Sequence, residues 1–189
     1  DNGASQEGGP TGVLEEMKFF NFVAEDPDTA VNRLEEIGGP RSHSNYPWGW
    51  AQVGNCPMRW YKQNTHGGGV RDPLVVHWPN GITERGGIRD QFHHITDITP
   101  TILELAGVEA PTDYRGIPQL PVAGTSLAYT LDDPDVATRR EAQYFEMFGH
   151  RAIWADGWKA VTHHEPGADY DDEAWELFHL DTDISETID

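Results

Sequence analysis

Residues 61–78 read Tyr61-Lys62-Gln63-Asn64-Thr65-His66-Gly67-Gly68-Gly69-Val70-Arg71-Asp72-Pro73-Leu74-Val75-Val76-His77-Trp78. The apolar run Leu74–Trp78 is closed by Pro79, and this pattern predicts a buried strand. The three glycines before it let the backbone reach positive φ and come close to a ligand or to another strand. Lys62 and Arg71 flank the glycines in an otherwise acidic chain, and such positive charge suits an anionic ligand.

The residues of this loop also fit a simpler interpretation. Most lysines are solvated surface residues, and Lys62 alone fits that description. His66 alone fits a hydrogen-bonded loop residue better than a ligand. The loop therefore indicates an anion site only in combination with other features of the chain.

The composition narrows the classes of protein that the chain can belong to. Its 189 residues suffice for one domain, or for one domain with a small annex. It has 13 basic and 32 acidic residues, and the net charge of −19 argues against a nucleic-acid partner and against an anionic membrane surface. The single cysteine excludes an internal disulfide, and no run approaches the length of a transmembrane helix.

Three segments have helical patterns. Residues 15–23 fit a short helix or an irregular segment. Residues 28–37 predict a helix that is capped by Asp28 and stopped by the glycines that follow. The clearest pattern covers residues 99–107, with Thr99 as the cap, Pro100 in the first turn and Gly107 just past the end.

Residues 41–60 predict a loop with anchoring aromatic side chains, and residues 108–140 predict a proline-rich connector. The tail differs, because it contains four short aromatic and β-branched segments, at residues 143–148, 151–154, 158–162 and 175–180. Turn signals such as Asp156-Gly157 separate them. The tail therefore predicts a small antiparallel sheet, and the chain as a whole predicts the α/β class.

Four stretches together resemble the C-terminal portion of a type I sulfatase, most closely a bacterial arylsulfatase of the alkaline-phosphatase superfamily. They are Asp1-Asn2-Gly3, the lysine loop at residues 62–73, the helix at residues 97–103, and the strands of the tail. The resemblance covers nearly the whole chain. It implies two domains: residues 1–120 as the C-terminal part of the sulfatase α/β catalytic domain, and residues 121–189 as a small antiparallel sheet subdomain.

Two features depart from the family pattern. Gly67 stands where many relatives have glutamate, which removes a carboxylate that would brace the loop. The formylglycine nucleophile, made from a Cys/Ser-x-Pro-x-Arg motif, is not in this chain. Cys56-Pro57-Met58-Arg59 has the wrong spacing for that motif. Because the chain opens at Asp1 without a methionine, we expect a preceding segment to hold the nucleophile half.

The resemblance also implies site chemistry. Asp1 and Asn2 would be metal ligands for Ca²⁺, which takes oxygen donors. Lys62 would be both catalytic and substrate-binding, because its ammonium would contact the sulfate and stabilise charge on the leaving oxygen. The partners would be a small-molecule sulfate ester and the missing N-terminal half of the same enzyme. The compartment stays open between bacterial cytoplasm and periplasm.

Two alternatives remain at this point. A phosphonate or phosphate monoester hydrolase of the same superfamily would share these motifs, since nothing in them separates sulfur from phosphorus. A non-catalytic binding module could keep the fold without the chemistry. If the sulfatase interpretation holds, Gly3 and the Lys62 loop must lie on the same side of the fold, close to one another.

Overall fold

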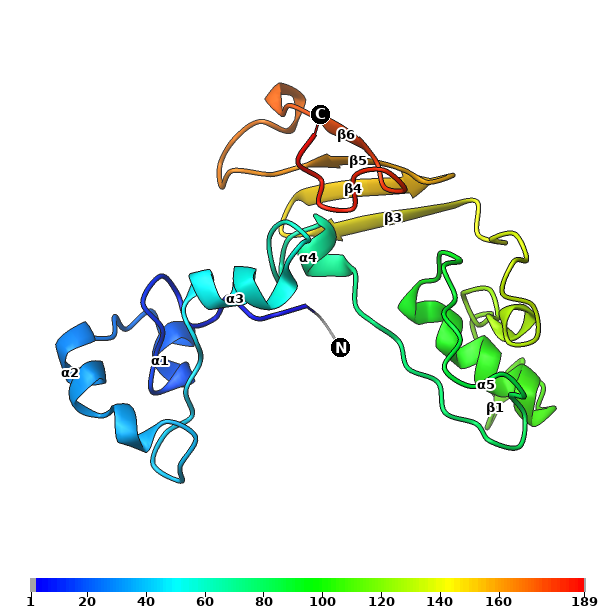
Figure 1. Cartoon of the computed structure of the whole chain (residues 1–189), viewed down its shortest axis with the longest axis horizontal. Helices are drawn as coiled ribbons and strands as arrows, with labels where there is room; N and C mark the ends of the chain where they lie inside the picture. Colours follow the sequence, from blue (N-terminus) through cyan, green and yellow to red (C-terminus); the bar gives the residue numbers. More distant parts are fainter. Residues whose placement is uncertain (1–2, 189) are drawn as a thin grey trace. The chain divides into compact units, whose positions relative to one another are not determined.

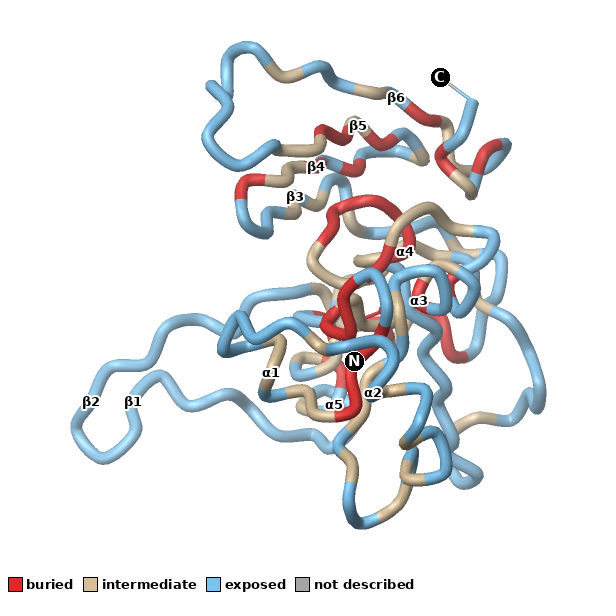
Figure 2. Tube along the Cα trace, turned by 90° about the vertical axis from the view of Figure 1, so that its left-hand side faces the viewer, coloured by how far each residue is buried: buried red, intermediate tan, exposed pale blue. Residues whose placement is uncertain are grey.

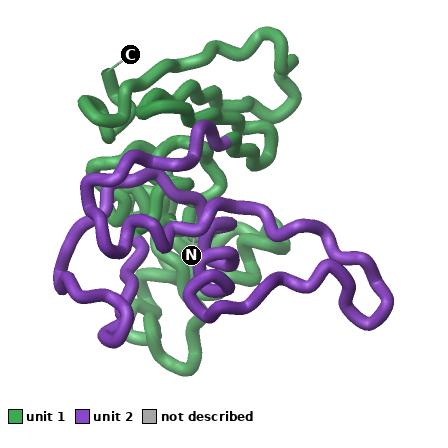
Figure 3. Tube along the Cα trace, turned by 90° about the vertical axis from the view of Figure 1, so that its right-hand side faces the viewer, with its two compact units in different colours: residues 1–73, 144–189 green, residues 74–143 purple. Residues whose placement is uncertain are grey.

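The computed structural model describes residues 3–188 (Figure 1), which divide between two compact units (Figure 3). Unit 1 comprises residues 1–73 and 144–189, of which 3–73 and 144–188 are described, and unit 2 comprises residues 74–143. This division does not test the predicted domains, residues 1–120 and 121–189, which stay a prediction. Helices and strands are mixed, as the α/β class requires.

The N-terminal part of unit 1 is helical and irregular. Its elements are α1 (Glu16–Phe20), α2 (Pro27–Asn32), the 3-10 helix η1 (Leu34–Glu36), α3 (Trp48–Asn55) and α4 (Gly67–Val70). The helix predicted over residues 28–37 is split into α2 and η1, and its cap is Asp26 rather than Asp28. Asp26 accepts hydrogen bonds from the backbone N–H groups of Asp28 and Thr29. Pro27 explains the shift, because its fixed φ suits the first helical position. The loop predicted over residues 41–60 contains the helix α3.

The C-terminal part of unit 1 is the predicted antiparallel sheet. It consists of β3 (Ala142–Met147), β4 (His150–Ala155), β5 (Trp158–Thr162) and β6 (Glu176–His179), in the order β3-β4-β5-β6. Asp156 and Gly157 have φ of 48° and 79°, which is the left-handed turn expected of Asp-Gly in a two-residue hairpin. The short 3-10 helix η4 (Tyr170–Asp172) lies between β5 and β6.

One face of this sheet is buried. In the register, Ala152 pairs with Val161 and Lys159 pairs with Phe178. Because side chains alternate along a strand, Lys159, Val161 and Phe178 share that face with Glu176. Ala152, Val161 and Phe178 form a buried apolar cluster with Phe145 and Leu180 against it. Figure 2 shows buried stretches along β4, β5 and β6. Two charged residues, Lys159 and Glu176, thus lie on the face that packs inward.

Unit 2 is built around one helix. Its elements are η2 (Ile95–Asp97), α5 (Ile98–Ala106), β1 (Asp113–Tyr114), β2 (Ile117–Pro118) and η3 (Ala128–Thr130). The predicted helix is confirmed, with Gly107 at φ 64° just past its end. It begins at Ile98, because the chain enters it directly from η2. The residue at the cap position is therefore Asp97, and the prediction of Thr99 as the cap is wrong. Pro100 still lies in the first turn, where its missing N–H leaves no hydrogen bond unmade.

The prediction for Leu74–Trp78 is wrong. These residues are neither strand nor buried: Val75 is 88% exposed and Leu74 is 56% exposed. A strand is held by hydrogen bonds to a neighbouring strand, and the two sheets within residues 3–188 do not include this run. The apolar composition of this run indicates a preference for burial, but it does not supply the neighbouring strand that a buried strand needs. Within the same residues, no helix has the length and apolar character needed to cross a membrane.

Candidate active site

The N-terminal segment and the lysine loop lie against each other in unit 1. The Lys62 backbone N–H donates to the Ala4 carbonyl over 3.0 Å. The Ala4 N–H donates to Oδ1 of the buried Asn55, whose Nδ2 donates to the carbonyl oxygens of Trp60 and Gly68. Asn55 therefore ties the segment that follows Asp1-Asn2 to both ends of the loop. The expected closeness of Gly3 and the Lys62 loop is confirmed.

Gly68 and Gly69 are required by close packing rather than by positive φ. A Cβ on Gly68 would lie 1.9 Å from the Trp60 carbonyl oxygen, and one on Gly3 would lie 2.1 Å from the Gly68 oxygen. Residues 67–70 instead form the helical turn α4. Positive φ occurs earlier, at Trp60 and Gln63. Gly68 and Gly69 do approach another part of the chain closely, but that neighbour is the backbone of the loop itself and not another strand. The positive φ that glycine allows does not occur at residues 67–69.

The Lys62 ammonium is paired with a carboxylate. Its Nζ lies 2.5 Å from Oε1 of Glu7, whose side chain is only 8% exposed. Ser5 Oγ donates to the other Glu7 oxygen. Burial by itself would raise the pKa of Glu7, but the hydrogen bonds from Lys62 and Ser5 outweigh it and the pKa is lowered. Glu7 therefore stays ionised at neutral pH and aims the ammonium, while two further donors of the ammonium remain for an anion.

The other side of the loop contacts the C-terminal sheet and the segment after it. Arg59 Nη1 and His66 Nε2 bond to the two carboxylate oxygens of Glu176, over 2.7 and 3.1 Å. The Gly67 N–H donates to Glu186 Oε2 over 2.8 Å, and Lys159 Nζ donates to Glu186 Oε1 over 2.6 Å. Arg59, His66 and Gly67 each contact a glutamate that lies 110 or more positions away in the sequence.

Burial controls the protonation of two of these groups. His66 is 1% exposed, and its removal from water lowers its pKa to about 4 in spite of the bond to Glu176. Burial also lowers the pKa of Lys159, although Glu186 opposes this change. At neutral pH His66 is therefore a neutral structural residue, which agrees with a bracing role inside the loop.

The predicted metal ligands lie outside the described residues. Asp1 and Asn2 precede Gly3, which packs on the carbonyl oxygen of Gly68. Within residues 3–188 no group of three or more His, Cys, Asp or Glu side chains could hold a metal ion. A carboxylate and an amide oxygen are suitable donors for a hard cation such as Ca²⁺. The donor chemistry at positions 1 and 2 therefore fits calcium, and this assignment stays a prediction.

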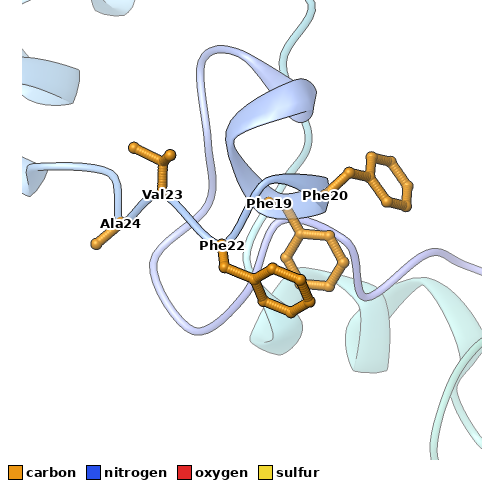
Figure 4. A pocket seen from close by; sticks show the side chains of 5 residues that line it. All are labelled: Phe19, Phe20, Phe22, Val23 and Ala24. Carbon is orange, nitrogen blue, oxygen red and sulfur yellow. The ribbon is translucent and has the colours of Figure 1, made fainter.

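A separate open pocket of about 410 Å³ lies at α1 and is lined by Phe19, Phe20, Phe22, Val23 and Ala24 (Figure 4). None of these side chains is polar. The pocket thus offers no polar side chain for orienting an anion, and none of its lining residues belongs to the lysine loop.

Two family profiles match the chain. The profile "Sulfatase" matches residues 1–108, and "N-sulphoglucosamine sulphohydrolase, C-terminal" matches residues 58–189. Each covers more than half of the chain, and the chain belongs to the sulfatase family. The second profile is a C-terminal one, as expected from the predicted C-terminal portion.

Individual relatives support the same assignment. An uncharacterised sulfatase of Schizosaccharomyces pombe is 31% identical over 82% of this chain and 28% of its own length. The arylsulfatase of Klebsiella aerogenes is 32% identical over 51% of this chain and 21% of its own length. The human N-acetylgalactosamine-6-sulfatase is 32% identical over 74% of this chain and 25% of its own length. The chain thus spans about a quarter of the length of these relatives.

Sequence reasoning missed several residues around the loop: Glu7, Asn55, Glu176 and Glu186. Each makes its contact through a side chain that the local pattern does not mark. Glu7 follows the Asp1-Asn2-Gly3 stretch at a short distance, and that proximity was the only available signal. The two C-terminal glutamates carry no comparable signal.

Proposed function

We propose that this chain is part of an enzyme that hydrolyses sulfate esters to an alcohol or phenol and sulfate, with the specificity of an arylsulfatase. The observation that carries the proposal is the junction in unit 1 where Ala4 bonds to Lys62. It brings the segment after Asp1-Asn2 to the one lysine of the glycine-rich loop. A basic group beside a candidate metal pair is the arrangement that binding and cleaving a sulfate ester needs.

Each residue has a definite role in this proposal. Lys62 would bind the sulfate group and stabilise negative charge on the leaving oxygen, because an ammonium beside an anion stays protonated. Glu7 would hold the ammonium in place, since its buried carboxylate is itself fixed by Ser5. Asp1 and Asn2 would hold Ca²⁺, which when bound supplies positive charge to the sulfate oxygens. The formylglycine nucleophile would come from the N-terminal half of the enzyme.

The test uses the protein expressed from its complete coding sequence. We expect turnover of an aryl sulfate such as p-nitrophenyl sulfate, and a fall in kcat of about 100-fold or more in Lys62→Ala. Lys18→Ala is the matched control. Lys18 lies on α1, pairs with Glu25 and takes no part in the loop. The 189-residue chain alone should be inactive, because it contains no Cys/Ser-x-Pro-x-Arg motif.

Three outcomes would contradict the proposal. Turnover of p-nitrophenyl phosphate or a phosphonate ester in preference to the sulfate would assign the protein to the alternative hydrolase class. Turnover of an N-acetylgalactosamine 6-sulfate in preference to the aryl sulfate would replace the arylsulfatase specificity. Activity that persists in Lys62→Ala would remove the lysine from the catalytic role.

A further inference from the structure

The buried residue Glu186 belongs to the short segment that follows β6, and it contacts the lysine loop. Its side chain is 1% exposed, and its backbone has φ 56°, a left-handed conformation that is uncommon for a residue other than glycine. Such a backbone persists only where the surroundings hold it, and positions of this kind gather at functional sites. The two carboxylate oxygens bind different donors, Lys159 Nζ and the Gly67 N–H.

We propose that Glu186 is a positioning residue for the lysine loop, and that its bond to the Gly67 N–H holds the loop in the conformation that presents Lys62 to the substrate. The proposal rests on the function proposed above for Lys62. It assigns to Glu186 a role that goes beyond neutralising Lys159.

Neutralising Lys159 does not by itself account for the arrangement. A buried ion pair is often no more stable than apolar side chains of the same volume, so Lys159 and Glu186 are a costly way to fill this space. A carboxylate here gains a use that an apolar residue lacks, because its second oxygen accepts the Gly67 N–H over 2.8 Å. Lys159 then pairs with the other oxygen of the same carboxylate, over 2.6 Å.

Hydrogen bonds and buried residues connect Gly67 to Lys62 along the loop. The Gly68 N–H donates to the Arg59 carbonyl over 2.8 Å, and the Asn64 N–H donates to the Tyr61 carbonyl over 3.1 Å. The residues between Lys62 and Gly67 include three that are buried, Asn64, Thr65 and His66. The loop is therefore held at both ends by carboxylates, by Glu7 at the Lys62 ammonium and by Glu186 at the Gly67 amide.

Gly67 is consistent with this role. A Cβ at this position would lie 3.4 Å from Met58 Cβ and 3.6 Å from Glu186 Oε1, which are ordinary contact distances. Space for a methyl group is thus present, with the Glu186 carboxylate and Met58 as its nearest neighbours. The carboxylate that braces the loop comes from a residue 119 positions later in the chain.

The experiment compares two double variants in the protein expressed from its complete coding sequence. Glu186→Gln/Lys159→Met keeps an acceptor for the Gly67 N–H, whereas Glu186→Met/Lys159→Met removes it with nearly the same shape. Neither leaves an unpaired buried charge. We expect the Gln variant to retain kcat, and the Met variant to lose roughly tenfold or more in kcat with little change in KM. Hydrogen exchange at the amides of residues 62–69 should be faster only in the Met variant.

The outcomes separate this inference from the proposed function. Equal kcat and equal exchange in the two double variants would overturn the positioning role. If the unaltered protein hydrolyses no sulfate ester, the proposed function fails, and the exchange comparison still decides whether Glu186 holds the loop. Glu186→Asp provides a second test should the Met variant not fold, because it keeps the charge for Lys159 and withdraws the oxygen from Gly67. Unchanged kcat together with unchanged exchange at Gly67 in Glu186→Asp would also overturn the inference.

Discussion

The ion pair between Lys62 and Glu7 allows a quantitative test of how the N-terminal segment is joined to the loop. A hydrogen bond to a charged group contributes about 1.5–3 kcal/mol to stability. Glu7 is almost fully buried, whereas the Lys62 side chain is 29% exposed and regains water when the pair is broken. We therefore expect a coupling energy at the lower end of that range, about 1.5 kcal/mol.

The two single variants should differ. Lys62→Met leaves the Glu7 carboxylate buried with Ser5 as its remaining hydrogen-bond donor, and we expect it to cost about 2.5 kcal/mol. Glu7→Gln leaves an ammonium that can reach water, and we expect a cost of about 1 kcal/mol. The double variant should cost about 2 kcal/mol, which is about 1.5 kcal/mol less than the sum of the two single costs.

Native-state hydrogen exchange provides the assay. The amide at position 62 donates to the Ala4 carbonyl, so its exchange reports opening of this junction directly. The pKa of folded Glu7 lies below its ordinary value, so the stability from its ionised form is fully present above about pH 4.3, the pKa of an unperturbed glutamate. That stability is lost as the pH falls through the folded pKa. A coupling below about 0.5 kcal/mol at pH 7, or one that is unchanged in acid, would refute the reasoning.

Two further predictions concern the C-terminal sheet and the loop histidine. Phe178→Ala should cost about 3–5 kcal/mol in the free energy of unfolding, because it opens a cavity in the buried cluster. Ile153→Ala, on the exposed face of β4, should cost about 1 kcal/mol or less. Equal costs in urea unfolding would contradict the assigned core. His66, with a pKa of about 4 when folded and about 6.5 when unfolded, should remove up to about 3 kcal/mol of stability as the pH falls from 6.5 to 4, because the unfolded chain takes up the proton first. Its ring resonances should not titrate above about pH 5, and a midpoint near 6.5 would show that His66 is not buried as described.

Local signals in the sequence determined much of this protein. The four strands of the tail, the Asp156-Gly157 turn and the helix ending at Gly107 follow from turn chemistry and hydrophobic spacing over a few residues. The motif resemblance also predicted that Gly3 would lie beside the loop of Lys62. These features could be predicted because each depends on residues that are close in sequence, or on a family pattern visible in the sequence.

Only the tertiary structure decided how the lysine loop is held. Glu7, Glu176 and Glu186 are ordinary glutamates in sequence, and their roles arise from the side chains that packing brings to them. The same reason explains the wrong prediction for Leu74–Trp78, since apolar residues become a buried strand only where a neighbouring strand supplies hydrogen bonds. It also explains Gly68 and Gly69, because the carbonyl oxygens of Trp60 and Asn64 that exclude a Cβ there come from other parts of the folded loop. Contacts between residues far apart in sequence depend on the whole packing arrangement, which no short pattern contains.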